Sequence, residues 1–191
     1  MIKEFSFQTD AYYNEITDKI VAIPKGSGQY RWMMMNYGYV EIRGIDVATS
    51  TVLEPYKDLF LNLKLTYTYQ KAQDFTKRIS PELEKTTYGG QIAYIPWHNG
   101  SAIASLKYKT WQLNYSFIYV GERYHSSANI REEYEQPWYT NDMALIKNIE
   151  YRDMKFRIGA EVSNVLNQDY EVVLNYPMPK RNYKLSLTIE I

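Results

Sequence analysis

The sequence predicts an all-β protein, an antiparallel transmembrane β-barrel segment with about eight long strands. Three observations lead to this prediction. Apolar and polar residues alternate with period two along much of the chain, short and long connections follow one another in turn, and no apolar run approaches the roughly 20 residues of a transmembrane helix. A membrane barrel built from such strands has one apolar and one polar face, so its average composition stays polar.

The last ten residues show the alternation without a break. A helix would scatter their apolar side chains around its circumference, whereas a strand places them all on one side. We therefore expect a terminal strand that presents to lipid the side chains of Tyr183, Leu185, Leu187, Ile189 and Ile191.

Seven further segments have the same period, with two irregularities. The alternation in residues 36–53 changes phase at Gly44, which predicts a β-bulge there. Lys147 falls on the face that is otherwise apolar in its strand. The segments are residues 4–14, 36–53, 59–70, 100–108, 111–120, 138–151 and 155–163.

The connections between these segments fall into two classes. Short turns are expected near residues 54–57, 109–110 and 152–153. Long polar or aromatic loops are expected at residues 15–35, 72–99, 125–137 and 167–181. Outer-membrane barrels are built with short turns at one end and long loops at the other, so this sorting favours a membrane barrel.

A soluble β-sandwich also produces alternating strands, and three features favour lipid instead. The predicted strands are about 10–14 residues long, against about 5–6 in soluble proteins. Polar and charged residues occupy mid-strand positions opposite the apolar face. Aromatic residues, including many of the 20 tyrosines, gather at strand ends as in an interfacial girdle. Two alternatives stay open: a self-contained eight-stranded membrane barrel with a structural or adhesive role, and a soluble β-sandwich or lipocalin-like binding module.

Composition excludes several functions. The chain has 22 basic and 22 acidic residues, so nothing in its charge predicts a nucleic-acid partner. It has no cysteine, which excludes thiol catalysis and thiolate metal sites. No catalytic constellation is visible, so we expect neither an enzyme nor a bound cofactor. His98 and His125 read as ordinary loop residues. The acidic loop at Glu132, Glu133 and Glu135 is interpreted as solvated, with calcium binding as the weaker interpretation.

One ordered set of motifs resembles a known family. An Asn-Val-Leu-Asn segment at residues 164–167 is followed by a tyrosine, a Tyr-Pro-x-Pro segment, an arginine and a final alternating strand, as at the C-terminal end of TonB-dependent outer-membrane receptors. Earlier segments match that family in order, at residues 11–14, 44–46, 67–69, 95–98 and 119–124. The motif residues are Asn164, Asn167, Tyr170, Tyr176, Pro177, Pro179 and Arg181.

The resemblance implies a function and a set of partners. Residues 1–191 would form the last eight strands of a barrel of about 22 strands, in the outer membrane of a Gram-negative bacterium. Such a receptor takes up a scarce ligand of the siderophore, cobalamin or glycan class with energy delivered by the TonB protein. The implied partners are membrane lipid and lipopolysaccharide, the remaining barrel strands and plug domain, TonB, the barrel-assembly machinery and the ligand.

Some positions depart from the family pattern. Lys180 stands where glycine is usual, and Ile191 stands where phenylalanine is common. The first residues contain no apolar signal segment, and neither a plug domain nor a TonB box is visible, so we expect a fragment of a longer receptor.

Aromatic and methionine residues near the predicted loops are the candidates for ligand contact. Methionine repacks easily and tryptophan stacks, which suits a bulky ligand. Packing against the plug or a neighbouring loop is the alternative for the Met33–Met35 run and its neighbours, and an aromatic girdle is the alternative for the other two. The ligand-facing candidates are Arg31, Trp32, Met34, Trp138 and Tyr139.

Overall fold

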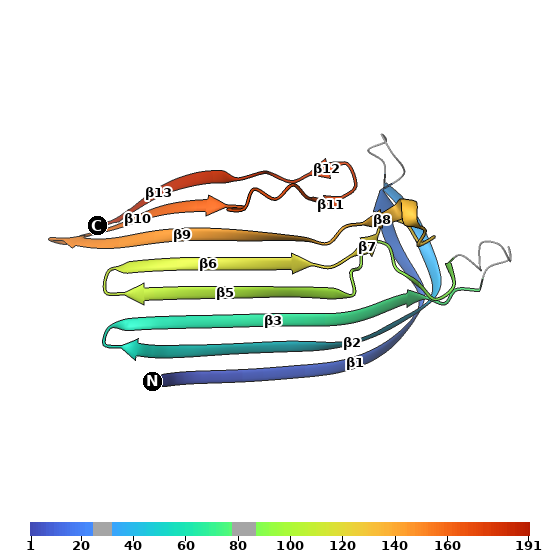
Figure 1. Ribbon diagram of the computed structural model, residues 1–191, viewed down its shortest axis with the longest axis horizontal. Coiled ribbons are helices and arrows are strands. Elements are labelled where there is room, and N and C mark those ends of the chain that lie inside the picture. Colours follow the sequence, from blue (N-terminus) through green and yellow to red (C-terminus); the bar gives the residue numbers. More distant parts are fainter. Residues whose placement is uncertain (25–31, 78–86) are drawn as a thin grey trace.

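The chain forms one large antiparallel sheet, shown in Figure 1. The computed structural model describes residues 1–24, 32–77 and 87–191. Its eight long strands follow one another across the sheet in chain order, and the short β4 (Gly90–Gln91) pairs with the third of them. This confirms the predicted fold class. The long strands are β1 (Ile2–Pro24), β2 (Trp32–Tyr56), β3 (Leu59–Asp74), β5 (His98–Tyr108), β6 (Trp111–Val120), β9 (Trp138–Tyr151), β10 (Met154–Ser163) and β13 (Asn182–Glu190).

The connections are sorted by length, as predicted. Two-residue turns follow β2, β5 and β9, and both chain ends lie at this end of the sheet (Figure 1). Each turn contains one residue with left-handed backbone, namely Asp58, Lys109 or Arg152. The long connections lie at the opposite end. Within the described ranges, no helix is long and apolar enough to cross a membrane.

The first predicted loop, residues 15–35, is wrong in its bounds. β1 continues to Pro24 and β2 begins at Trp32, and the two strands stay paired, for example Ile20 with Asn36. Residues 16–23 are rich in β-branched side chains, which favour extended backbone, and a hairpin partner satisfies their hydrogen bonds. The hairpin of β1 and β2 therefore rises beyond the other strands and curves over their end (Figure 1).

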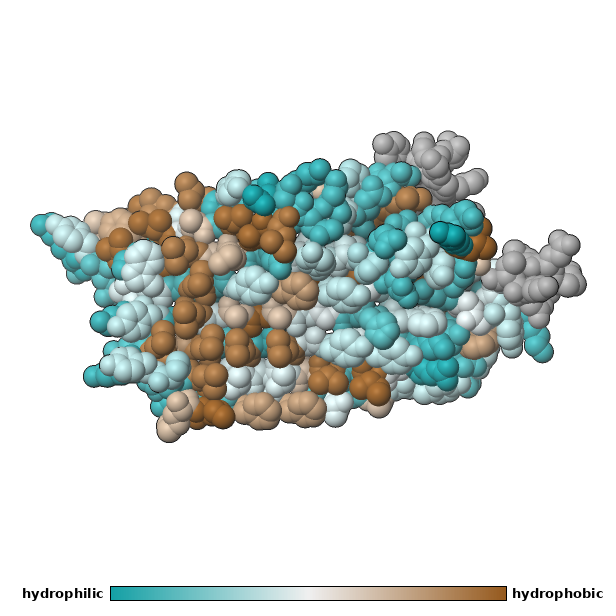
Figure 2. Space-filling model, viewed as in Figure 1, coloured by the Kyte–Doolittle hydropathy of each residue, from teal (hydrophilic) through white to brown (hydrophobic). Residues whose placement is uncertain are grey.

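One face of the sheet, here called the apolar face, carries the predicted aliphatic rows. The strand registers align one such row directly across six strands. No described segment covers it, and side chains such as Leu145 and Leu185 are exposed, by 44% and 84%. Figure 2 shows hydrophobic residues in a band across the half of the sheet nearer the short turns. The aligned row consists of Leu61, Leu106, Leu113, Leu145, Ala160 and Leu185.

The opposite face, here called the polar face, holds hydrogen-bonded side chains in mid-sheet. Ser105 donates to Asn114 at 2.7 Å, and Gln112 donates to both of these side chains. Thr66 and Ser101 share a further hydrogen bond of 2.7 Å between their hydroxyls. Polar side chains that bond one another in this way suit a wet barrel interior.

Lys147 lies on the apolar face, as the alternation predicts, directly opposite Trp111. Its ammonium group sits 4.4 Å from the centre of the Trp111 ring and donates to the Thr110 hydroxyl at 2.6 Å. The long aliphatic stem thus carries the charge to the short-turn end of the sheet.

The predicted β-bulge at Gly44 is wrong. The register of β1 with β2 runs through this position without a shift, pairing Tyr12 with Gly44. A Cβ at residue 44 would lie 2.5 Å from the Tyr69 carbonyl oxygen and 2.6 Å from the Tyr12 hydroxyl. Glycine is required because the Tyr12 ring crosses the backbone at this point, and the strand stays regular.

The change of phase at Gly44 has another cause, a small core on the polar face. Above Gly44, Ile42 and Val40 are buried there beneath Ile92, which the connection between β3 and β5 folds inward over the sheet. Because this connection supplies apolar contacts on the inner side, the inward positions become apolar and the outward positions Arg43 and Glu41 become polar.

β1 and β13 are the two edges of the described sheet. A backbone N–H or C=O group at an edge that has no hydrogen-bond partner costs roughly several kcal/mol in hydrocarbon, like any other unpaired polar group. A membrane-embedded sheet of this kind therefore requires further strands along both edges.

The two faces predict opposite tolerance of charge. Leu145→Arg, on the apolar face, is expected to lower the free energy of unfolding in lipid vesicles by about 2–4 kcal/mol, because the guanidinium faces hydrocarbon. Ala144→Arg is the control, since its side chain lies on the polar face between Asn114 and Glu161 and is expected to cost less than about 1 kcal/mol. Urea titration of both variants measures the difference, and equal losses would contradict the assignment of the faces.

Gly44 gives a second test. Gly44→Ala is expected to destabilise the protein by about 1–3 kcal/mol, because the new methyl group collides with the Tyr69 backbone. The matched control is Gly100→Ala, where the closest atom to a new Cβ lies at 3.3 Å. If urea titration found both substitutions neutral, the close crossing of Tyr12 over residue 44 would be refuted.

Candidate functional site

Three connections meet at the long-connection end of the sheet and form one assembly, here called the loop cluster. It consists of residues 87–97, 121–137 and 164–181. Short pieces of secondary structure give each segment a defined path, as Figure 1 shows at its right-hand end. Besides β4, these are β7 (Arg123–Tyr124), the 3-10 helix η1 (Arg131–Glu133), β8 (Tyr134–Glu135), β11 (Glu171–Val173) and β12 (Tyr176–Pro177).

Arg123 ties two of these segments together. Its side chain is only 3% exposed, and its guanidinium donates to three backbone carbonyl oxygens: Gln136 at 3.3 Å, Glu171 at 2.7 Å and Val172 at 3.3 Å. Burial lowers the pKa of Arg123. A guanidinium offers five N–H donors in a planar fork, which suits this convergence of carbonyls.

The third segment joins through backbone and amide contacts. The Tyr94 backbone N–H donates to the Tyr124 carbonyl at 2.8 Å, and the Tyr94 hydroxyl accepts from the Leu174 N–H at 3.4 Å. Burial raises the pKa of the Tyr94 phenol. The side chain of Asn129 both accepts from the Gln91 N–H and donates to the Gln91 carbonyl at 2.8 Å, as a neighbouring strand would. The three segments are thus held as one unit.

Asn164 fixes where the last connection leaves the sheet. It is buried and has a left-handed backbone, which asparagine tolerates better than most residues. Its side chain donates to the Gln168 carbonyl and accepts from the Gln168 N–H, both at 2.8 Å, while its own N–H donates to Asp142 at 2.8 Å. Asn167, also left-handed, accepts from the Arg181 N–H at 3.1 Å. Both asparagines therefore shape the turn that brings the chain back into β13.

Two tryptophans in and beside the cluster hold indole N–H groups without an acceptor among the described residues. Trp97 lines a pocket of about 200 Å³ with Gln91, Glu122 and Asn129. Trp138 packs on Tyr170, with ring centres 4.6 Å apart, and lines an open hollow of about 580 Å³. An indole N–H donor that is shielded from water favours an acceptor on a bound molecule.

The acidic loop is engaged internally. Glu135 lies 3.1 Å from His125, Glu133 accepts from the Ser126 hydroxyl, and Glu122 accepts from the Tyr134 hydroxyl at 2.8 Å. The hydrogen bond to Glu122 raises the pKa of Tyr134. In the part of the chain that the structure describes, no three His, Cys, Asp or Glu side chains are grouped so as to hold a metal ion.

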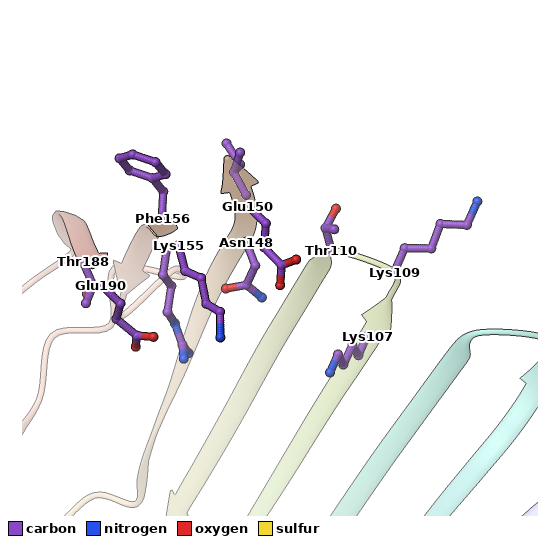
Figure 3. A pocket seen from close by; sticks show the side chains of 11 residues that line it. Lys107, Lys109, Thr110, Asn148, Glu150, Lys155, Phe156, Thr188 and Glu190 are labelled. Atoms are coloured by element: carbon purple, nitrogen blue, oxygen red, sulfur yellow. The ribbon is translucent and has the colours of Figure 1, made fainter. Parts of the chain in front are cut away.

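A second hollow, of about 320 Å³, lies at the short-turn end. Figure 3 shows Lys155, Glu150 and Glu190 on one side of the strands and Phe156 on the other, as the alternation requires. Lys155 is the direct cross-strand neighbour of both glutamates, so the row alternates in charge on the polar face. This row suits contact with a polar protein surface inside a barrel.

The residues predicted to contact a ligand lie in different places. Trp138 lines the hollow on the polar face, whereas Tyr139 lies on the apolar face opposite Tyr119, in the aromatic layer. Trp32 and Met34 are exposed on the hairpin of β1 and β2. Arg31 lies outside the described residues.

The motif residues all lie in the last segment of the loop cluster, residues 164–181, where Tyr176 and Pro177 form β12. Tyr170 is half-buried against Trp138, whereas Pro179 and Arg181 are exposed. The predicted terminal strand presents Tyr183, Leu185, Leu187 and Ile189 on exposed positions, and Ile191 follows the end of β13.

Sequence reasoning missed two residues of this end, Arg123, which joins two of the segments, and Trp97, which lines the pocket. Both lie within segments that match the family, yet neither spacing nor composition shows which side chains become buried. An arginine three residues after a strand has the same local pattern whether it is buried or exposed. Only the backbone carbonyls of distant segments, such as that of Glu171, distinguish the two cases.

Comparison with known proteins agrees with this geometry. Residues 3–165 match the family model of TonB dependent receptor-like β-barrels. The chain is similar in structure to BauA, the ferric preacinetobactin receptor from Acinetobacter baumannii, with a TM-score of 0.73 and 14% identity over 97% of this chain and 27% of that one. It is also similar to the ferric-catecholate import receptor Fiu from E. coli K12, with a TM-score of 0.66 and 16% identity over 98% of this chain and 25% of that one. A third similar structure is the FrpB iron transporter from Neisseria meningitidis, with a TM-score of 0.59 and 16% identity over 97% of this chain and 28% of that one. The chain thus spans about a quarter of the length of these proteins.

Arg123 allows a direct test of the loop cluster. Arg123→Met removes the donors to three carbonyls and is expected to lower the free energy of local opening by about 2–3 kcal/mol, because three hydrogen bonds from a charged group are lost. Hydrogen exchange of the amides in residues 164–174 should accelerate by roughly 30- to 150-fold. Arg131→Met, on the exposed η1, is the control and should leave exchange unchanged. Equal rates of hydrogen exchange in the two variants would contradict the proposal that Arg123 holds the two segments together.

Proposed function

The chain belongs to the TonB-dependent receptor-like β-barrel family, and we propose that it forms part of the wall and outer rim of an outer-membrane receptor in a Gram-negative bacterium. In this proposal the receptor binds a scarce ligand from outside the cell and takes it up with energy delivered by the TonB protein. The observation that carries the proposal is the pairing of an uncovered aliphatic face with a polar face onto which the long connections fold. A soluble sheet would cover its aliphatic rows with a second layer.

The proposed ligand is a ferric chelate of the siderophore class. The three similar structures described above carry names that refer to iron or to ferric complexes. The loop cluster offers suitable chemistry, since Trp138 and Tyr170 form an aromatic wall and the indole N–H groups of Trp97 and Trp138 can donate to the oxygen atoms of a chelate. Exposed Trp32 and Met34 on the long hairpin extend the same surface in this proposal.

The polar face is proposed to surround a plug domain. Alternating charges in the Glu150–Lys155–Glu190 row and the hydrogen-bonded Ser105, Gln112 and Asn114 cluster suit a protein surface in a wet interior. Further barrel strands, placed by the barrel-assembly machinery, would pair with the edges β1 and β13. No step in this function requires covalent chemistry on the chain.

The alternatives that the sequence left open fit less well. A closed eight-stranded barrel would need β1 and β13 to pair, but these strands have 23 and 9 residues and lie at opposite edges. A soluble sandwich or lipocalin-like module would bury Leu113, Leu145 and Ile158, each of which is at least 36% exposed.

Iron uptake tests the proposal. Iron-starved cells that express the receptor should take up radioactive iron from at least one of a catecholate, a hydroxamate and a mixed-ligand ferric chelate, and a protonophore should stop uptake. Trp138→Ala is expected to weaken the apparent affinity about tenfold or more, as loss of a central aromatic contact does. Trp111→Ala, on the apolar face at the short-turn end, is the control. Uptake that does not depend on the receptor, or that continues without proton-motive force, would refute the proposed function.

A further inference from the structure

The hollow of about 580 Å³ beside Trp138 carries charge of one sign only. Its lining residues come from two segments, residues 134–138 and 168–171. Every charged side chain in this lining is a carboxylate, namely that of Glu135, Asp169 or Glu171, and no lysine, arginine or histidine of the described residues belongs to it. A molecule in the hollow therefore meets negative charge from both segments.

Three basic side chains interact with these carboxylates from outside the lining. Arg123 lies within electrostatic range of Glu135, but its guanidinium is buried and donates to backbone carbonyls. His125 contacts the same glutamate at 3.1 Å and carries charge only when it is protonated. Lys180 pairs with Asp169 at 3.0 Å, but these two side chains are 60% and 71% exposed, so water screens the pair. None of these cations can meet a molecule inside the hollow.

The carboxylate of Glu171 has the least compensation. Its Oε2 atom accepts a hydrogen bond of 2.6 Å from the Asn175 backbone N–H, and no lysine, arginine or histidine of the described ranges forms an ion pair with it. Arg123 binds the backbone carbonyl of Glu171 and leaves the side chain free to face a ligand.

Aromatic rings line the same hollow. Trp138 and Tyr170 pack with their ring centres 4.6 Å apart and their planes inclined by 32°, and Tyr134 adds a third ring. Burial and, after it, the Asp142 carboxylate raise the pKa of the Tyr170 phenol. The faces of such rings attract cations, and tryptophan does so most strongly. Aromatic faces beside carboxylates suit the recognition of an ammonium group.

This combination separates ferric chelates by their charge. A ferric catecholate complex has a net negative charge, and lysine and arginine bind such anions through charge-assisted hydrogen bonds. A ferric hydroxamate complex is neutral, and a free amine on the chelator makes it cationic. Because like charges at a binding site disfavour a ligand and opposite charges favour it, the lining of the hollow selects the cationic complex.

We propose that the hollow binds the ammonium group of a cationic ferric chelate, a hydroxamate complex whose chelator carries a free primary amine. Asp169 and Glu171 supply the negative charge, and Trp138 offers its ring face to the ammonium group. The inference rests on the proposed function, since it takes the ligand to be a ferric chelate, and it adds the charge class that the proposed function leaves open.

The test compares derivatives of one linear ferric hydroxamate chelate that differ only at one end. The end is a free amine, an acetylated amine or a succinylated amine, so the complex is cationic, neutral or anionic around the same iron centre. Isothermal titration of the whole receptor, purified in mild detergent, should give a roughly tenfold higher affinity for the amine form than for the acetylated form. The succinylated form should bind most weakly. Equal affinities, or the reverse order, would overturn the inference.

The double variant Asp169→Asn/Glu171→Gln assigns the preference to the hollow. It should bind the amine and acetylated forms equally well, with its affinity for the acetylated form unchanged, because the new amide at residue 171 still accepts from the Asn175 N–H. The control Glu132→Gln/Asp153→Asn removes the same charge from exposed positions outside the lining and should keep the preference. A preference that survives in the first variant, or that is lost in the control, would contradict the assignment.

Binding and uptake together separate this inference from the proposed function. A receptor that prefers the amine form through Asp169 and Glu171 but transports no iron would refute the iron-uptake function alone. A receptor that takes up a ferric chelate and binds the three derivatives equally, or binds none of them, would refute the charge preference alone.

Discussion

In the proposed receptor, the contact between an aliphatic face and hydrocarbon constrains nearly every other feature of this sheet. Because side chains alternate along a strand, each residue that faces lipid places its neighbours on the other face, where they meet water, a plug or a folded connection. The row from Leu61 to Leu185 remains straight across six strands because any slip of one residue would turn an aliphatic row toward water. Register, strand length and the sorting of the connections all follow from keeping that row in the membrane.

The same constraint explains why the pattern inverts along β2. Below Gly44 the outward residues Ile45 and Val47 are apolar, and above it the outward residues Arg43 and Glu41 are polar. The strand itself continues without a bulge, so what changes is the medium on each side. On the inside, the 87–97 connection supplies Ile92 to cover Ile42 and Val40, and in the proposed receptor the outside would pass from hydrocarbon to lipid headgroups at this height.

The sequence was sufficient for the fold class, for eight strands and for the alternating short and long connections, because period-two alternation is a local property. It was insufficient where a distant segment decides the environment. The slip at Gly44 looked like a bulge because the covering Ile92 lies some fifty residues further along the chain, and residues 16–23 looked like loop because their partner strand begins beyond the connection. Beside the loop cluster, Trp138 was recognised as a tryptophan next to a long loop. Arg123 was not singled out, because its role depends on carbonyls from residues 136, 171 and 172.

The most direct test of the account is a measurement of which medium each face touches. The chain has no cysteine, so single cysteines introduced one at a time along β6, Trp111–Val120, can each carry a nitroxide label without background. In receptor embedded in lipid, the account predicts that labels at residues 113, 115 and 117 collide mainly with oxygen, which concentrates in hydrocarbon. Labels at residues 112, 114 and 116 should be shielded from oxygen and report the polar interior. A profile without period two, or one in which a water-soluble nickel chelate reaches residues 113, 115 and 117 freely, would contradict it.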